Sequence, residues 1–348
     1  MRAGRGGGTL DEHQSGRDAA HRTPSGRFDE DDVRVRPGRG TRPRSRLRPL
    51  HLDATGGFVT AVDRGRYTCL VADRAVTAAR ARELGRKSVV VGDRVALVGD
   101  LTGEDGTLAR IVRVEERSTV LRRTADDDDP YERVVVANAD QLVIVTSLAD
   151  PPPRTGLIDR CVVAAYVGGL EPLLCLTKSD LATPDALLAE YAALGLAAVT
   201  TQRGTEPAEL RARLADQMSV LIGHSGVGKS TLVNALVPAA ARATGVVSAI
   251  GRGRHTSSSA VALPLAGGGW VIDTPGIRSF GLAHATPADL LVAFPDLAGG
   301  AEGCPPGCAH GSAADGCTLD AWVAAGHAAP ARLDSFRRLL AARTAPDA

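Results

Sequence analysis

The stretch GHSGVGKS, residues 223–230, combines residue types and a spacing that bind phosphate groups. It matches the pattern G-x-x-x-x-G-K-[ST], with the apolar run SVLI before it and the helix-forming run KSTLVNALV from Lys229 onward. In such a loop the backbone N–H groups and the positive end of the helix dipole face the phosphates. We expect Lys229 to reach the β- and γ-phosphates and the Ser230 hydroxyl to bind Mg²⁺. The nucleotide-binding residues predicted here are Gly223, His224, Ser225, Gly226, Val227, Gly228, Lys229, Ser230 and Thr231.

Four polar residues, TKSD at 177–180, follow an apolar run and have the chemistry to read a purine base. The Asp180 carboxylate can accept two hydrogen bonds from guanine, whereas adenine presents an acceptor at the equivalent ring nitrogen and is rejected. Lys178 would lay its stem over the base, and Thr177 and Ser179 complete this nucleotide-binding set. The alternative is that Ser179 and Asp180 only cap the following helix. Asp180 argues against a second enzymatic alternative, a P-loop ATPase or kinase.

Two further segments carry oxygen ligands suited to Mg²⁺. The sequence DTPG, residues 273–276, ends an apolar run, and Asp273 is expected to hold Mg²⁺ beside the P-loop. The Gly276 N–H is expected to contact the γ-phosphate and to reorient when that phosphate leaves. The hydroxyl-rich segment GRGRHTSSS, residues 251–259, places Thr256 where its hydroxyl can join the magnesium ligands.

The source of the hydrolytic group is less evident from the sequence. Ile277 stands where Ras-like GTPases place a glutamine that orients water, and an aliphatic side chain cannot make that hydrogen bond. Intrinsic hydrolysis is therefore expected to be slow. His255 is the candidate catalytic residue that positions water or transition-state charge. The alternative is that His255 faces solvent or RNA.

A cysteine and histidine cluster lies near the C-terminus. The sequence CPPGCAHGSAADGC supplies three thiolates and one imidazole within a short stretch. That ligand set closes a tetrahedral site, so one structural Zn²⁺ per chain is predicted, with no open position for catalysis. The predicted zinc ligands are Cys304, Cys308, His310 and Cys317.

The order of the motifs along the chain is unusual. The base reader TKSD comes before the P-loop, and DTPG comes last, whereas a typical GTPase opens with the P-loop and ends with the base reader. The four motifs keep their cyclic order, as if the domain had been cut between DTPG and TKSD and its old ends joined. The sequence therefore predicts a circularly permuted GTPase domain.

The elements around the motifs indicate a multidomain chain. Short alternating strands at residues 48–125 predict an N-terminal β-barrel of the OB-fold type that binds RNA. Strands and helices alternate over 134–297, which is typical of an α/β P-loop GTPase domain. Residues 298–348 form the zinc-binding module with a C-terminal helix. An acidic linker, TADDDDPYE, separates the first two domains.

Composition restricts the class of protein further. The chain has 348 residues, a net charge of +1 and six cysteines, three of them in the C-terminal cluster. This cysteine usage indicates a reduced, cytoplasmic protein, and neither a secretory signal nor a membrane span is expected. Of the three lysines, Lys178 and Lys229 fall inside the TKSD and P-loop motifs. Arginine replaces lysine almost everywhere else, which singles out these two positions.

The first 47 residues are rich in glycine, arginine, aspartate and proline and are expected to be disordered. Two interpretations remain open for this tail. It is either a solvated segment or an arginine arm that lies on nucleic acid phosphates, because seven arginines fall between residues 34 and 48.

Taken together, these motifs resemble the ribosome small-subunit-dependent GTPase A family of bacteria. The resemblance covers roughly residues 48–343 and rests on ANADQLVIV, TKSDL, GHSGVGKSTLVNAL, GRGRHTSS, DTPGIRSFGL and the cysteine cluster. The cluster spacing C-x3-C-x-H-x6-C differs from the usual C-x4-C-x-H-x5-C by one residue on each side. The segment VTTQRGTE differs from the usual Ser-Ala form, so no base contact is assigned there.

The resemblance implies GTP hydrolysis stimulated by the 30S ribosomal subunit, and a role as a checkpoint in late 30S maturation. The implied partners are the 30S subunit, its 16S rRNA and other 30S assembly factors, with the chain acting as a monomer. A binding-module alternative is that GTP merely locks the shape of a ribosome-binding clamp, with hydrolysis incidental.

Overall fold

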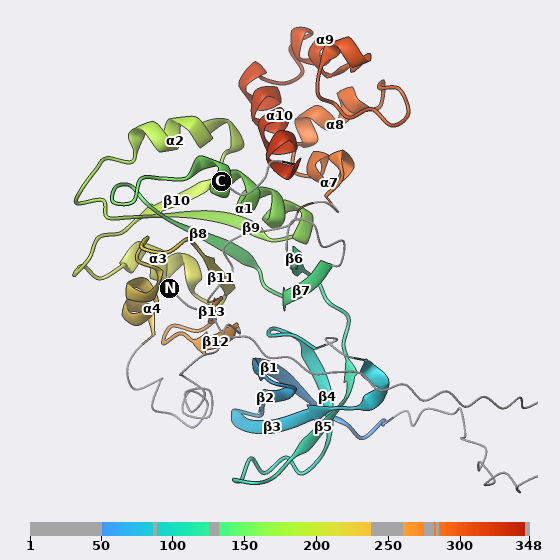
Figure 1. Ribbon diagram of the computed structural model, residues 1–348, viewed down its shortest axis with the longest axis vertical. Helices are drawn as coiled ribbons and strands as arrows, with labels where there is room; N and C mark the ends of the chain where they lie inside the picture. Colours follow the sequence, from blue (N-terminus) through green and yellow to red (C-terminus); the bar gives the residue numbers. More distant parts are fainter. Residues whose placement is uncertain are drawn as a thin grey trace, which may run out of the picture. The chain divides into compact units, whose positions relative to one another are not determined.

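The computed structural model describes most of the chain beyond its arginine-rich start (Figure 1). The described residues are 51–85, 89–124, 132–237, 260–274, 282 and 285–344. The predicted tail at 1–47 therefore lies outside the described residues. So do the segment 251–259, with His255 and Thr256, and the pair Gly276 and Ile277.

Five strands close into a barrel at the N-terminal end of the described chain (Figure 1). They are β1 (Thr55–Asp63), β2 (Arg66–Val71), β3 (Arg74–Arg80), β4 (Arg94–Gly99) and β5 (Ala109–Val114). β1 pairs with both β2 and β4, while β5 pairs with both β4 and β3, so the ring of strands is closed. Only β3 and β5 are parallel within this ring. The predicted N-terminal β-barrel is confirmed, and it has five strands.

Alternation of buried and exposed residues along β2 and β5 contributes to the barrel core. In β2, Tyr67, Cys69 and Val71 are buried while the residues between them are partly exposed. The same cluster contains Leu97 from β4 and Ile111 from β5. Aliphatic side chains thus fill the barrel, as the low aromatic content requires.

A β-hairpin replaces part of the linker that the acidic run had suggested. β6 (Val120–Thr124) and β7 (Glu132–Ala137) pair antiparallel on either side of residues 125–131. Leu121 and Val136 of this hairpin are buried in the same core cluster as Ile158 and Val162. The acidic run therefore joins two paired strands, because apolar residues on each side of it can be buried together.

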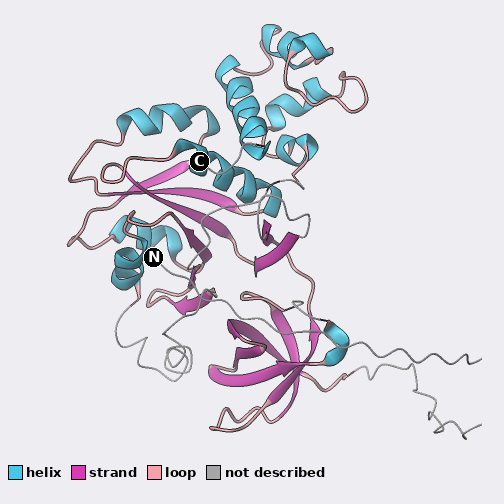
Figure 2. Cartoon of the chain, viewed as in Figure 1, coloured by secondary structure: helices cyan, strands magenta, loops and turns pink. Residues whose placement is uncertain are grey.

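A mixed sheet forms the centre of the next part of the chain (Figure 2). Its strands are β8 (Gln141–Ser147), β9 (Glu171–Thr177), β10 (Ala197–Thr200), β11 (Met218–Ile222), β12 (Val261–Pro264) and β13 (Trp270–Asp273). The order β10-β9-β8-β11-β13-β12 is parallel throughout except for the antiparallel pair β13–β12. Every residue of β8 is buried, as expected for a central strand covered on both faces.

Helices cover both faces of this sheet. They are α1 (Thr155–Gly168), α2 (Asp185–Tyr191), α3 (Ala208–Leu214) and α4 (Lys229–Leu236). Leu142 and Ile144 of β8 share a cluster with residues of α1 and α2, whereas Val143 and Val145 share another with α3 and α4. The period-2 alternation of side chains along the strand thus assigns α1 and α2 to one face and α3 and α4 to the other.

Four α-helices lie within the described residues 285–344. They are α7 (Pro287–Leu291), α8 (Pro295–Ala301), α9 (Leu319–Ala324) and α10 (Pro330–Thr344). Thr286 begins α7 with a capping box, in which its side chain and that of Asp289 each accept the other's backbone N–H. α10 packs along α1, and Phe336 packs edge-on against Phe294 with ring centroids 5.2 Å apart. The C-terminal helix therefore extends the core that surrounds α1.

Charged groups accompany this packing. Arg338 of α10 lies 3.2 Å from the Asp159 carboxylate of α1, and its guanidinium sits 4.8 Å from the centre of the Tyr191 ring. Burial raises the pKa of Asp159, and the nearby Arg338 opposes that shift. Arg332 donates to the backbone oxygens of Ala193 and Ala293. α10 is thus held by apolar contact and by arginines that reach the chain outside α10.

Among the described residues, no helix combines the length and the apolar character needed to cross a membrane.

We expect Phe336→Ala to lower the free energy of unfolding by about 3–5 kcal/mol, because it removes a fully buried ring by which α10 packs against Phe294. Urea unfolding followed by circular dichroism measures the change. The control is Val292→Ala, since Val292 is 81% exposed and its truncation should cost less than about 0.5 kcal/mol. Equal stability of the two variants would contradict the packing role of α10.

Candidate functional site

The P-loop lies where the sequence places it, between the end of β11 and the start of α4. Gly226 and Gly228 have φ values of 87° and 93°, a region that favours glycine. Gly223 packs against the backbone oxygen of Val145, so a side chain there would collide with the central strand. These glycines let the loop turn tightly over the sheet and leave its N–H groups at the start of α4.

A buried hydrogen bond joins the P-loop to the base reader. Thr177 ends β9, and its hydroxyl donates to the backbone oxygen of Val227, with an oxygen-to-oxygen distance of 2.6 Å. Thr177 is 6% exposed and Val227 is fully buried, so water does not compete for this bond. The structure therefore brings TKSD and the P-loop together although the two residues are 50 positions apart.

Lys178 and Ser179 hold the rest of the TKSD turn. Lys178 has a φ of 58°, and its ammonium donates to the backbone oxygen of Asp150. The Ser179 N–H and hydroxyl both approach the backbone oxygen of Thr201, at 3.2 and 3.3 Å. Pro151 lies beside Gly226, so the segment after β8 also borders the P-loop. No sequence pattern predicts the contact to Asp150.

The TKSD motif and the P-loop border one pocket of about 370 Å³. Thr177, Lys178 and Asp180 line one side, and Thr231, Leu232 and Ala235 of α4 line another. The third wall is the loop of residues 201–207, in which Gln202 to Thr205 and Pro207 face the pocket. Asp180 is exposed, so its carboxylate is accessible to a base.

The sequence predicts no base contact in the loop 201–207, most of which belongs to the unusual segment VTTQRGTE. Thr201 uses both of its backbone groups, because its N–H donates to Leu176 and its oxygen accepts from Ser179. The signal that could have found this wall is a short strand, β10, followed by a polar run with Gly204.

The magnesium side of the cradle is built from two parallel strands. β11 and β13 pair with Leu221 opposite Asp273, which sets Asp273 beside the start of the P-loop. The Lys229 ammonium lies 2.5 Å from the Asp273 carboxylate and 3.3 Å from the Thr274 backbone oxygen. Thr274 is anchored in turn, since its buried hydroxyl donates to Leu221.

The remaining predicted residues of this site lie in the P-loop, in the first turn of α4 or outside the described residues. Ser230, the second residue of α4, is exposed, and so is Ser225. His224 has its Nδ1 2.9 Å from the backbone oxygen of Ser225. His255, Thr256 and Gly276 lie outside the described residues, so the structure tests none of their predicted roles.

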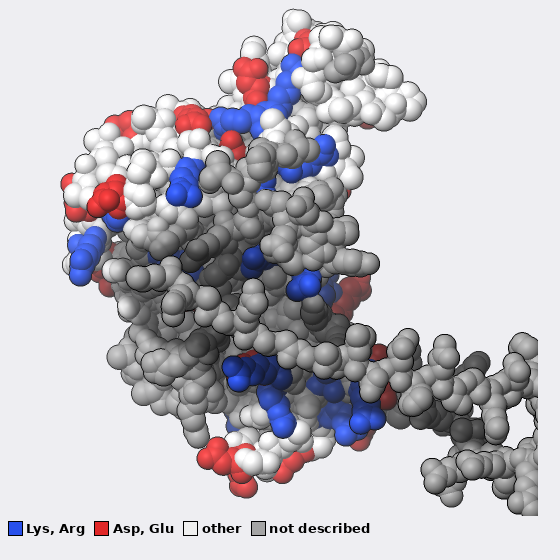
Figure 3. Space-filling model, in the orientation of Figure 1, with Lys and Arg blue, Asp and Glu red and all other residues white. Residues whose placement is uncertain are grey.

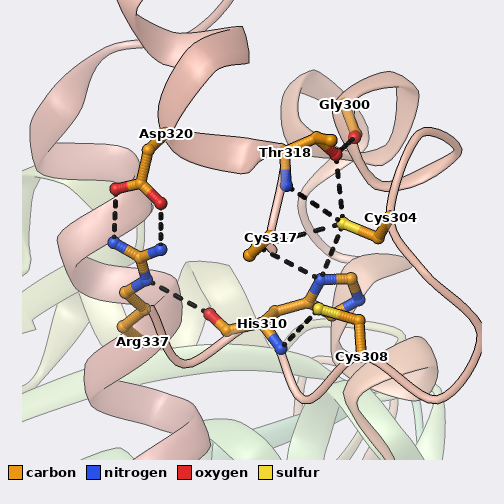
Figure 4. Close-up of polar contacts among 8 residues, drawn as sticks. All are labelled: Gly300, Cys304, Cys308, His310, Cys317, Thr318, Asp320 and Arg337. Atoms are coloured by element: carbon orange, nitrogen blue, oxygen red, sulfur yellow. Dashed lines mark hydrogen bonds and ion pairs between the residues drawn. The ribbon is translucent and has the colours of Figure 1, made fainter. Parts of the chain in front are cut away.

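The four predicted zinc ligands converge in the C-terminal module (Figure 4). Their ligand atoms all lie within 4.8 Å of one another. Zn–S bonds of about 2.3 Å and Zn–N bonds of about 2.0 Å imply tetrahedral edges of roughly 3.8 Å and 3.6 Å. The Cys304 and Cys317 sulfurs are 3.9 Å apart, and His310 Nδ1 lies 3.5 and 3.7 Å from them. The cluster therefore fits a Zn²⁺ ion.

Neighbouring groups orient these ligands. The Thr318 backbone N–H donates to the Cys304 sulfur at 3.4 Å, and the Thr318 hydroxyl lies 3.1 Å from the same atom. Arg337 of α10 donates to the His310 backbone oxygen and makes a bidentate pair with Asp320. The hydrogen bond from Arg337 lowers the pKa of Asp320. Figure 4 shows this pair on one side of the cluster, so α10 supports the loop that carries His310.

Comparison with known proteins places these features in one family. The model of the family described as RsgA GTPase matches residues 114–283. A Small ribosomal subunit biogenesis GTPase RsgA of Chlorobaculum tepidum is 36% identical over 305 residues, which cover 83% of this chain and 98% of that protein. A Small ribosomal subunit biogenesis GTPase RsgA 1 of Vibrio vulnificus is 37% identical over 268 residues, with 74% of each chain covered.

Solved structures agree with the fold. The structure of YjeQ from Thermotoga maritima has a TM-score of 0.60 and 25% identity, and covers 83% of this chain and 98% of its own. The structure of YloQ, described as a circularly permuted GTPase, has a TM-score of 0.58 and 24% identity, covering 85% and 98%. The predicted permuted fold is confirmed.

We expect Asp180→Asn to weaken GTP binding by roughly 10²- to 10⁴-fold and to favour xanthine nucleotides. Each hydrogen bond to a charged group is worth about 1.5–3 kcal/mol, and the amide presents a donor to guanine's N1–H. Competition against a fluorescent guanine nucleotide measures both affinities. Asp185→Asn, an exposed change outside the pocket, is the control and should bind as the parent does. Equal affinity of the parent for ATP and GTP would contradict this base assignment.

We expect the purified chain to hold one Zn²⁺, and Cys308→Ala to lose it, because the cluster then keeps only three ligands. Nucleotide binding should persist, since no residue of the cluster lines the nucleotide pocket. Metal analysis by plasma mass spectrometry gives the metal content. Cys69→Ala, a buried cysteine of the barrel, is the control and should retain zinc. Metal-free parent protein, purified without chelator, would contradict the zinc assignment.

Proposed function

The chain belongs to the RsgA GTPase family, and on this basis we propose that it hydrolyses GTP under stimulation by the small ribosomal subunit. It acts in late 30S maturation as an assembly checkpoint. The observation that carries the nucleotide part of this proposal is the buried bond from Thr177 to Val227. This bond holds Asp180 of TKSD and Lys229 of the P-loop at the same site. A single ligand that contacts both must carry a guanine base and a phosphate chain.

Nucleotide binding divides among three groups of residues. Asp180 accepts from guanine, Lys178 lies over the base, and Thr177 and Ser179 hold the turn that presents them. The N–H groups of the loop that contains Gly226 and Gly228 bind the phosphates. Lys229 exchanges its contact with Asp273 for the β- and γ-phosphates, because its ammonium already faces that side of the cradle.

Hydrolysis requires a metal and a group that positions water. Ser230, Asp273 and Thr256 would hold Mg²⁺, which when bound neutralises charge on the phosphates as it develops. Gly276 contacts the γ-phosphate through its N–H. We assign the water-positioning role to His255, because Ile277 cannot fill it.

Relatives with names that specify small ribosomal subunit biogenesis support the choice of partner. We propose that the chain, as a cytoplasmic monomer, binds the 30S subunit, its 16S rRNA and other assembly factors. Figure 3 shows arginine side chains gathered over part of the barrel. Arg66, Arg94 and Arg110 of the barrel strands are exposed. These residues have the charge to bind RNA phosphates.

The proposed domains divide this work. Residues 1–47 form an arginine-rich tail, 48–125 the RNA-binding barrel, 134–297 the GTPase domain and 298–348 the zinc module. We propose that one Zn²⁺ stabilises the C-terminal module without taking part in the chemistry. Its ligand set is full with three thiolates and one imidazole, so no position is left for a reacting group.

We expect GTP turnover to rise by roughly 10²-fold or more when purified 30S subunits are added, because the missing hydrolytic contact must be completed by the complex. Release of inorganic phosphate is measured with 30S subunits, with 50S subunits and without ribosomes. The 50S arm is the control and should resemble the unstimulated rate. Equal rates in all three would instead support the clamp alternative, in which GTP only locks a ribosome-binding shape.

The same assay tests His255. His255→Ala should reduce stimulated turnover by roughly 10²-fold, while GTP affinity and 30S binding stay near those of the parent. Unchanged turnover would leave His255 as a loop residue only. Loss of 30S binding would make it an RNA contact.

A further inference from the structure

A single arginine connects two walls of the nucleotide pocket. Arg211 lies on α3, which follows the loop 201–207 directly. Its Nε lies 2.8 Å from the Glu206 carboxylate, which belongs to that loop. Its two terminal nitrogens donate to the backbone oxygens of Ala235 and Leu236 in the last turn of α4, at 2.9 and 3.0 Å. The pocket lies between the same loop and the same helix.

The contacts suit an arginine and no other side chain. The guanidinium is a rigid planar fork with five N–H donors, so it can address a carboxylate and two carbonyls at once. The carbonyls at the end of α4 lack partners within their helix and carry the negative end of the helix dipole, which favours a cation there. The Arg211 side chain is 30% exposed, and the Glu206 side chain is 62% exposed. The link is therefore partly screened by water, and its effect should be moderate.

The bridge ends on residues that line the pocket or adjoin its lining. Ala235 both lines the pocket and accepts from Arg211, while Glu206 stands between Thr205 and Pro207, which also line it. Moving the loop away from α4 would widen the space between them. The opposite wall does not depend on this bridge, since the hydrogen bond from Thr177 to Val227 holds it separately.

We propose that Arg211 is a positioning residue that sets the spacing between the loop 201–207 and α4, and so preorganises the pocket for guanine. This rests on the proposed function, in which that pocket receives the base. Arg211 touches neither the phosphate loop nor the residues assigned to hydrolysis. Its loss should therefore weaken binding of the ground state and transition state equally, which raises KM and leaves kcat unchanged.

The test compares three variants of the full chain. Arg211→Ala removes the whole bridge. It should weaken the binding of fluorescent guanosine diphosphate and of fluorescent guanosine triphosphate by the same factor, about tenfold. Glu206→Ala removes the loop contact and keeps the contacts to α4, so about threefold is expected. Arg211→Lys keeps the charge but loses the fork, and should fall between the parent and Arg211→Ala.

Arg213→Ala is the matched control. Arg213 lies on the same helix, is exposed, and makes no side-chain hydrogen bond or ion pair among the described residues. It should bind nucleotide as the parent does. Stimulated turnover with 30S subunits should show a raised KM for GTP and a kcat within twofold of the parent for Arg211→Ala. Thermal unfolding reports separately on any change in stability.

Three results would overturn the proposal. The first is a dissociation constant for Arg211→Ala within twofold of the control, even with a lower melting temperature, which would make Arg211 a helix cap only. The second is an unchanged affinity in Glu206→Ala beside a weakened one in Arg211→Ala, because the bridge would then play no part. The third is a fall in kcat with KM unchanged.

Failure of this inference differs from failure of the proposed function. If Asp180→Asn changes nucleotide preference and Arg211→Ala does not change affinity, only the bridge is wrong. If Asp180→Asn leaves guanine preference intact, the pocket assignment itself is wrong.

Discussion

The hydroxyl of Thr177 and the backbone oxygen of Val227 make the contact on which the nucleotide site depends. Neither motif is complete without the other, because a phosphate cradle selects no base and a base reader binds no phosphate. Their junction is buried, so leaving the Val227 oxygen without its partner would cost about 1–3 kcal/mol. In this permuted domain the two motifs come from strands β9 and β11, which flank β8. The order of the strands in the sheet thus keeps the two motifs close in space, although their order along the chain is reversed.

A second constraint is the position of α1, which is covered by the sheet on one side and by α10 on the other. Cys161, Val162 and Ala165 are fully buried, although helices of an α/β domain usually keep one face in water. Asp159 of α1 is buried as well, and a buried carboxylate is costly unless it is paired. Its ion pair with Arg338 of α10 supplies that partner. The helix that supports His310, a predicted zinc ligand, through Arg337 therefore also covers the GTPase core.

The sequence predicted those features in which residue types recur at a short, fixed spacing. The P-loop, TKSD and the cysteine cluster are of this kind, because in each the predicted ligand is bound by a few residues that are close together in the sequence. Contacts between distant segments have no such signature. Arg211 looks like any helix arginine, and the loop 201–207 departs from the familiar base-contact form. Strand β3 also has little sequence signature of its own, since the alanine-rich RAVTAAR lacks the β-branched alternation typical of strands. Strand β12 pairs with its neighbour β13 and also with the distant β1. The hairpin β6–β7 is buried in the core cluster that also contains α1.

The order of the elements also bears on how the chain is made. Synthesis from the N-terminus delivers β8, α1 and β9 early, so this parallel pair can form with one edge of β8 still open. β8 gains its second neighbour only when β11 emerges, and α1 gains its cover only with α10, the last described helix. An unpaired apolar edge and a bare helix face both invite association with other chains. A nascent or truncated copy that stops before α10 is therefore exposed to aggregation, because the apolar face of α1 then lacks its cover.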